Sequence, residues 1–158
     1  MLKLIKRMVI IISNISNIKI DLLYKINKKK FLNDIKKLNF FKSVELIEPL
    51  IEWEIIINQI YNIDFPVYKK LDFDDKFIYN LNNELKFNNN SEILLPFFNE
   101  TQYWIKAILL DKYLFLKYLS NNNIINNITI ISVVNNKVYD IEVGENEKIF
   151  ELRINSKT

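Results

Sequence analysis

Alternation of apolar and polar residues near the C-terminus is the feature that most constrains how this chain can fold. Residues 138–143 (VYDIEV) place Asp140 and Glu142 between apolar side chains, and residues 149–154 (IFELRI) repeat the pattern. A period of two puts successive side chains on opposite faces of a strand, so both segments are expected to be half-exposed strands. The polar segment between them contains Gly144 and predicts a turn, where a positive φ angle can be required.

Three more apolar runs occupy the C-terminal third. Residues 128–134 (ITIISVV) predict a further strand. Residues 103–110 (YWIKAILL) and 113–119 (YLFLKYL) are apolar and aromatic, and only Asp111 and Lys112 separate them. This arrangement predicts a β-hairpin. The C-terminal third is therefore expected to consist of antiparallel strands that follow one another along the chain.

The N-terminal half carries helical patterns instead. Residues 30–42 repeat apolar side chains at helical spacing, with lysines on the other side, and predict an amphipathic helix. Residues 49–62 fit two structures, because Ile51, Trp53, Ile55 and Ile57 alternate with glutamates as in a strand, while Leu50, Trp53, Ile57 and Ile60 form a helical stripe. The length of the segment, and Pro49, which is tolerated in a first helical turn, favour the helix. Residues 69–87 fit either a short helix or a hairpin.

Together these patterns predict an α+β fold, in which an N-terminal helical region packs on a C-terminal antiparallel β-meander. The chain has 158 residues, of which 49% are hydrophobic and 26% are charged, as in a globular protein that buries its own core. No repeat or linker divides the sequence. We therefore expect residues 1–158 to form a single domain.

The choice of residues reflects the coding genome. The chain contains 28 Ile, 23 Asn and 20 Lys, but only one Ala, one Gly and two Arg. The first three residues have A/T-rich codons, whereas the codons of the last three are mostly G/C-rich. An A/T-rich genome therefore explains the asparagine clusters, which need no functional interpretation.

Several kinds of functional site are excluded because the chain has no His, no Cys and a single Gly. Zinc sites built on His and Cys are excluded, and so are Cys nucleophiles and Ser–His pairs. The Gly-rich dinucleotide motif and the P-loop are excluded as well. We expect no enzymatic activity and no cofactor.

The N-terminus has some features of a signal peptide. Lys3, Lys6 and Arg7 precede an apolar run at residues 8–12, but this run is shorter than the core of a signal peptide and no small-residue cleavage site follows. No segment reaches the ~18–20 apolar residues that span a bilayer. These features predict a cytoplasmic protein without a membrane span.

One group of acidic residues retains a candidate chemistry. Asp72, Asp74 and Asp75 are followed by Glu84 and Lys86. On a strand, Glu84 and Lys86 would project from one face. An acid with a Glu-x-Lys pair can hold Mg²⁺ and orient a water for phosphodiester hydrolysis. The pattern loosely resembles that of metal-dependent nucleases.

Charge is distributed unevenly along the chain, whose formal net charge is +3. Residues 1–42 carry +9, residues 43–111 carry −7 and residues 112–158 carry +1. The lysines of the basic segment could bind the phosphate groups of a nucleic acid. Arginine, the residue that most often recognises bases, is scarce, which argues against nucleic acid as a direct ligand. The acidic segment suits a basic protein partner. Ordinary solvated faces, or pairing of the two segments inside the fold, would also explain the pattern.

Acidic and aromatic residues are mixed in residues 63–75, a composition typical of a surface that docks on a basic protein and also of a loop over a core. The predicted partner-binding residues are Asp64, Phe65, Tyr68, Asp72, Phe73, Asp74 and Asp75. The sequence thus predicts a small, non-catalytic inhibitor of the immunity, antitoxin or anti-defence type. Its predicted partner is a basic, nucleic-acid-processing enzyme such as a nuclease toxin.

Two alternative functions remain. The basic N-terminal third and the lack of catalytic residues would also suit a structural subunit of a large assembly, such as an organellar ribosome or a respiratory complex encoded by an A/T-rich genome. The second alternative is the magnesium-dependent nuclease.

Overall fold

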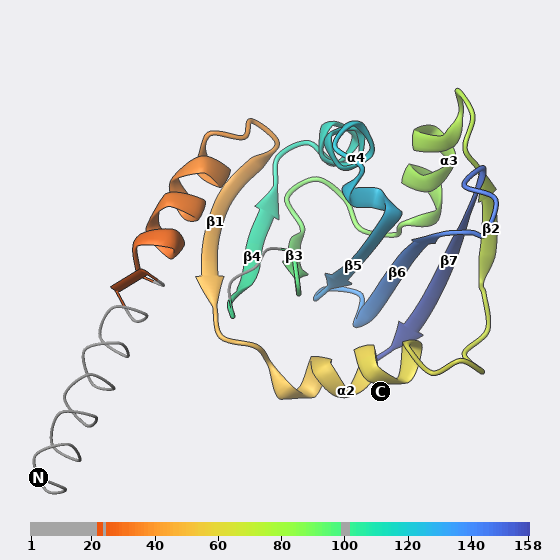
Figure 1. Cartoon of the computed structure of the whole chain (residues 1–158), viewed down its shortest axis with the longest axis horizontal. Coiled ribbons are helices and arrows are strands. Elements are labelled where there is room, and N and C mark those ends of the chain that lie inside the picture. The colour runs from red at the N-terminus through yellow and green to blue at the C-terminus, as the bar shows by residue number, and fades with distance from the viewer. Residues whose placement is uncertain (1–21, 24, 99–101) are drawn as a thin grey trace, which may run out of the picture.

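The computed structural model describes residues 22–23, 25–98 and 102–158. Seven antiparallel strands form one sheet, in the order β1-β4-β3-β5-β6-β7-β2, with helices on both of its faces (Figure 1). This arrangement confirms the predicted α+β fold. In chain order, the elements are a helix at residues 25–36, β1 (Phe41–Ile47), α2 (Ile51–Ile60), β2 (Lys69–Asp72), α3 (Phe77–Glu84), β3 (Glu92–Leu95), β4 (Trp104–Leu109), α4 (Lys112–Asn121), the 3-10 helix η1 (Ile124–Asn126), β5 (Asn127–Ser132), β6 (Lys137–Val143) and β7 (Ile149–Ser156).

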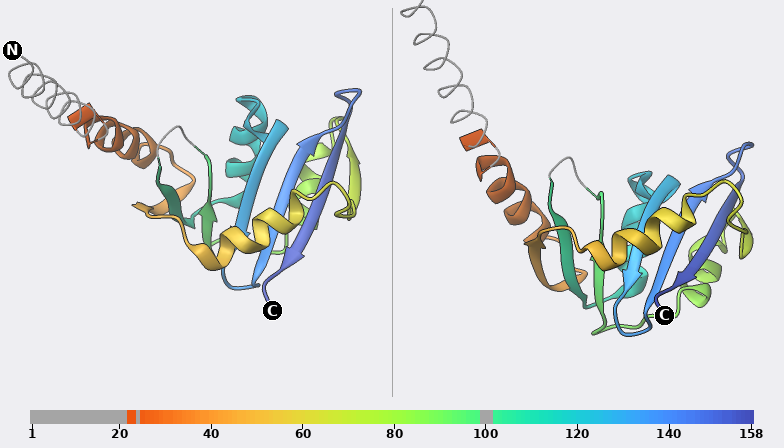
Figure 2. Two further views of the ribbon diagram at one scale, coloured as in Figure 1. Left: turned by 60° about the horizontal axis from the view of Figure 1, so that its bottom comes forward. Right: turned by 90° about the horizontal axis from the view of Figure 1, so that it is seen from below.

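The helices form two layers around the sheet. α3 and α4 lie over one face, and α2 crosses the other face (Figures 1 and 2). The helix at residues 25–36 lies beside β1, at the outer end of the sheet. Strands β5, β6 and β7 are neighbours in both sequence and space, which confirms the predicted C-terminal meander.

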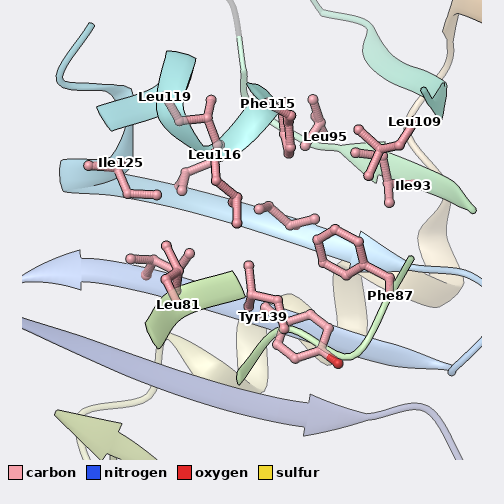
Figure 3. Packing of buried hydrophobic residues seen from close by; sticks show 14 of the residues in the cluster. Leu81, Phe87, Ile93, Leu95, Leu109, Phe115, Leu116, Leu119, Ile125 and Tyr139 are labelled. Atoms are coloured by element: carbon pink, nitrogen blue, oxygen red, sulfur yellow. The ribbon is translucent and has the colours of Figure 1, made fainter. Parts of the chain in front are cut away.

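The main hydrophobic core lies between the sheet and the helices α3 and α4 (Figure 3). On β6, the alternate residues Tyr139 and Ile141 are fully buried in this core, which confirms the period of two. Leu81 from α3 and Phe115 from α4 are also fully buried in it. Each strand therefore contributes every second side chain to one continuous core.

A smaller core lies beneath α2. Trp53, Ile57 and Ile60 recur at helical spacing and are buried, which confirms the helix predicted at residues 49–62. They pack against side chains from the opposite face of the strands. These are Leu94, Trp104, Ile131 and Val138.

The predicted hairpin is wrong, because residues 113–119 lie in α4 and only the first of the two apolar runs forms a strand, β4. Asp111 begins the helix: its side chain accepts a hydrogen bond from the Leu114 amide at 3.0 Å. The buried residues of α4 are Lys112, Phe115, Leu116 and Leu119. Their spacing of three and four residues places them on one helical face, but an apolar run alone does not distinguish a buried helix from a strand.

The helix predicted at residues 30–42 is too long. Helical conformation ends at residue 36, and β1 begins at Phe41. Pairing of β1 with β4, which is more than fifty residues away in sequence, makes this segment a strand. Residues 69–87, which the sequence allowed to be either a short helix or a hairpin, contain strand β2 and helix α3.

Gly144 serves close packing and not a positive φ angle. A Cβ atom at this position would lie 2.9 Å from the carbonyl oxygen of Ile149, which accepts the Gly144 amide hydrogen bond. The positive φ of the turn belongs to Glu147, at 57°. The turn between β6 and β7 is therefore confirmed, while the predicted reason for its glycine is wrong.

Candidate partner-binding surface

The predicted acidic and aromatic residues lie along one outer edge of the sheet. β2 is the terminal strand next to β7, and residues 64–68 and 73–75 flank it at its two ends (Figure 1). We call residues 64–75 the acidic strip. Of its seven predicted partner-binding residues, six are exposed and only Phe65 is half-buried.

The three aromatic residues of the strip differ in role. Phe65 packs against the core beneath α2 and so holds the strip onto the fold. Tyr68 and Phe73 are 60% and 54% exposed. The ring of Phe73 also contacts those of Phe77 and Phe150, with centroids 5.3 and 5.5 Å away. The core therefore fixes Phe73 while much of its surface remains open to a partner.

The two lysines of the strip lie on the surface beside acidic residues that belong to other elements. Lys69 forms an ion pair with Glu84 at the end of α3. The Nζ atom of Lys70 lies 4.0 Å from Oε1 of Glu151 on β7, whose other partner is Arg153. Part of the positive charge of the strip is therefore offset by carboxylates outside it.

The acids of the strip are not neutralised in this way. Asp64, Asp72 and Asp75 are exposed and form no ion pair with the described part of the chain. Oδ1 of Asp74 accepts a hydrogen bond from the Lys76 amide at 2.9 Å, which shapes the turn before α3 but leaves the carboxylate exposed. The strip therefore presents net negative charge to solvent.

The backbone of β2 is a poor site for adding another strand. Beyond β2, the described residues place no further strand at this edge of the sheet. The strand has only four residues, three of which are charged, and Pro66 precedes it. Short, charged edges near proline are typical of edges that resist strand pairing. A partner would therefore meet the side chains of the strip and not its backbone.

The residues of the nuclease pattern do not have the expected geometry. Glu84 is the last residue of α3 and Lys86 lies beyond that helix, so the two do not lie on the strand that the nuclease pattern requires. Glu84 pairs with Lys69, and Lys86 Nζ donates to the carbonyl oxygen of Asn83 at 2.7 Å. Within residues 22–23, 25–98 and 102–158, no three carboxylates are arranged to hold a metal ion.

A cavity of about 670 Å³ on the α2 side of the sheet was not foreseen from the sequence. It lies just beyond α2, where Tyr61, the segment after β3 and η1 surround part of β5 and β6. Its size is in the usual range of ligand pockets. Its lining includes Tyr61, Phe97, Phe98, Thr129, Asp140 and Glu142, and none of its described lining residues is Lys or Arg.

Hydroxyl groups in this cavity point their hydrogens toward one carboxylate. Thr129 Oγ1 donates to Asp140 Oδ1 at 3.1 Å, across the β5–β6 pair. The hydroxyl groups of Tyr61 and Thr129 lie 2.8 Å apart. Since threonine has one hydroxyl hydrogen, and that hydrogen goes to Asp140, Tyr61 is the donor in this second bond.

Asp140 is 4% exposed and forms no ion pair with the described residues. Its cross-strand neighbour Arg153 lies 3.4 Å from Glu142 and 2.8 Å from Glu151 instead. The second oxygen of Asp140 accepts no hydrogen bond from the described residues, and it is not sealed from solvent, because Asp140 lines the cavity. Burial raises the pKa of Asp140, and the hydrogen bond from Thr129 offsets only part of this.

Sequence periodicity placed Asp140 on the polar face of β6, and this face is correct. The prediction of a half-exposed side chain is wrong for Asp140 because Tyr61, from the end of α2, reaches across to Thr129 beside it. One sequence feature could have indicated this polar contact: Thr129 and Asp140 are both polar and lie on strands that were expected to be neighbours.

Replacing Asp140 with asparagine is expected to become more favourable to stability as the pH rises. Because the folded state raises the pKa of Asp140, the folded chain binds more protons than the unfolded chain above the ordinary aspartate pKa of about 3.9. The free energy of unfolding of the unmodified protein therefore falls as the pH rises from the ordinary aspartate pKa to the raised pKa of Asp140. The neutral amide of the asparagine variant does not ionise, so the variant does not lose this stability.

Denaturant unfolding between about pH 3 and about pH 7 measures this effect. The difference between the D140N variant and the unmodified protein should grow with pH in favour of the variant. Asp34→Asn, at an exposed position on the N-terminal helix, is the matched control and should show no such trend. A difference for D140N that stays constant with pH would contradict the buried charge.

A buried lysine has a structural role. Lys112 Nζ donates to the carbonyl oxygens of Asn82, at 2.8 Å, and Leu85, and it lies 4.9 Å from the centre of the Phe87 ring. Burial, together with the charge of Lys86, lowers the pKa of Lys112 to about 8. The ammonium group caps the end of α3 and joins that helix to α4.

Comparison with protein-family models, curated proteins and solved structures finds no match to this chain. The described part of the chain contains no helix that is long and apolar enough to cross a membrane.

Proposed function

We propose that this protein is a non-catalytic inhibitor, of the immunity, antitoxin or anti-defence type, that binds a basic, nucleic-acid-processing enzyme through the acidic strip. The observation that carries the proposal is the difference in pairing within the strip. Its lysines have acidic partners outside the strip, Glu84 and Glu151, while Asp64, Asp72 and Asp75 are exposed and without ion pairs to the described residues.

This arrangement supports binding in two ways. Unpaired surface carboxylates attract a basic partner and speed its association. Tyr68 and Phe73 offer large exposed aromatic surfaces between and beside these charges, and such side chains are typical anchors of interfaces. An enzyme that binds nucleic acid carries a positive site, which the strip would cover in place of the phosphate backbone.

Co-expression tests the proposal directly. Each protein encoded next to this chain's gene is expressed alone and together with the chain. We expect one neighbour to arrest growth as a nucleic-acid-processing enzyme, and we expect the chain to restore growth. The purified chain should also inhibit cleavage of DNA or RNA by that enzyme at equimolar amounts. Neighbours that neither bind the chain nor lose activity in its presence would overturn the proposal.

The N-terminal helix supports a second candidate, a structural subunit of a large assembly. At this end of the chain Leu22, Leu23 and Ile26 are 53%, 58% and 61% exposed, next to exposed lysines such as Lys25 and Lys29. Apolar and basic side chains together would suit an assembly that contains RNA. A subunit of this kind should be insoluble or unstable when purified alone, whereas an inhibitor should be soluble as a monomer or dimer.

A further inference from the structure

We propose that the cavity beside Tyr61 and Asp140 is a binding site for an organic cation with N–H donors, either a guanidinium or a primary ammonium group. This site lies on the α2 side of the sheet and is separate from the acidic strip. The proposal does not depend on the inhibitor function.

The first argument is the charge balance around Asp140. Three carboxylates, those of Asp140, Glu142 and Glu151, lie around the guanidinium of Arg153, and the only other cation that the described residues place here is Lys70, 4.0 Å from Glu151. Arg153 and Lys70 contact the two glutamates, so Asp140 is buried without an ion pair to the described residues. Buried carboxylates are rarely left unpaired, because the low dielectric of the interior makes an isolated charge costly. A bound cation would supply the missing counter-charge.

The second argument is hydrogen bonding. One oxygen of Asp140 is bonded to Thr129, and the other receives no bond from the described residues and is not sealed from solvent, because Asp140 lines the cavity. The hydrogen bond from Thr129 stabilises the charged form of Asp140 and so offsets part of the effect of burial. A ligand N–H group would satisfy the remaining oxygen with a charge-assisted hydrogen bond.

The third argument is the wall of the cavity. Tyr61 and Phe97 are 52% and 63% exposed and line it together with Glu142. Aromatic side chains and carboxylates are the groups that favour ammonium and guanidinium ions. No described lining residue is basic, which disfavours an anionic ligand. The described residues also lack a group of three carboxylates arranged for a metal ion.

Titration of the full chain, labelled with ¹⁵N and followed by NMR, tests the site. Three probes are compared: the peptide acetyl-Gly-Arg-Gly-amide, its citrulline counterpart and putrescine. Citrulline has nearly the shape of arginine without its charge, so it isolates the contribution of the cation. Asp140→Asn keeps the shape of the side chain and removes its charge, and Asp34→Asn is the control at an exposed site remote from the cavity lining.

We expect the arginine peptide or putrescine to shift the amide signals of Thr129 and Asp140 saturably, while the citrulline peptide does not. D140N should weaken this binding by at least about tenfold, whereas D34N should leave it unchanged. Tighter binding of the peptide identifies a protein side chain as the source of the cation, and tighter binding of putrescine identifies a free amine. No saturable shift with either cation, or equal binding to D140N in a folded state, would overturn the site.

Discussion

Replacement of Phe115 by alanine is expected to lower the free energy of unfolding by about 3–5 kcal/mol, because a large, fully buried ring is removed. Phe115 is completely buried in α4, and its ring centroid lies 5.7 and 5.6 Å from those of Phe40 and Phe41. Its removal leaves a cavity where α4 meets the start of β1. A loss of this size is a large fraction of the total stability of an ordinary domain.

Denaturant unfolding measures this loss, and the same helix provides the control. Tyr113→Ala removes an aromatic ring that is 48% exposed and should change stability by no more than about 0.5–1 kcal/mol. If the alanine variant at Phe115 does not fold, Phe115→Leu should still fold and lose roughly 1–2 kcal/mol. Equal losses for Tyr113→Ala and Phe115→Ala would contradict the helical assignment of this apolar run.

Reversing two charges in the acidic strip is expected to slow association with the basic partner by about tenfold or more. The variant Asp72→Lys/Asp75→Lys changes two exposed, unpaired carboxylates and spares Asp74, which shapes the turn. Because the attraction between opposite charges is screened by ions, the association rate of this variant should also depend less on salt.

The matched control reverses two acids outside the strip that also lack an ion pair to the described residues. Glu48→Lys/Glu54→Lys produces the same change in net charge, but Glu48 follows β1 and Glu54 lies on α2. Stopped-flow or surface plasmon resonance measurements at several salt concentrations compare the two variants. If both slow association equally, then the overall charge of the chain controls binding and the strip has no special role.

Local patterns in the sequence were sufficient for part of the fold. The alternation around Asp140 and Arg153 predicted β6 and β7, and the helical stripe of Trp53, Ile57 and Ile60 predicted α2. In these segments polar residues alternate with apolar ones or lie opposite them, so the period of the side chains is visible in the sequence, even though residues 138–141 of β6 are buried on both faces.

The elements that were missed depend on distant pairing or on burial of both faces. β1 is a strand because it pairs with β4. Residues 113–119 form a helix, but the run has so few polar side chains that its helical period is not visible in the sequence. The burial of Asp140 follows from the contact of Tyr61 with Thr129 on β5, which joins residues 68 positions apart in the sequence. Composition located the acidic strip, but only the structure relates its lysines to Glu84 and Glu151.

Hydrogen–deuterium exchange of the chain, alone and with its partner enzyme, tests the central proposal most directly. Exchange reports which backbone amides become protected when the complex forms. If the acidic strip is the interface, residues 64–75 gain protection and the basic helix at residues 25–36 does not. Protection confined to residues 25–36, with the acidic strip unchanged, would contradict the proposal and favour a structural subunit.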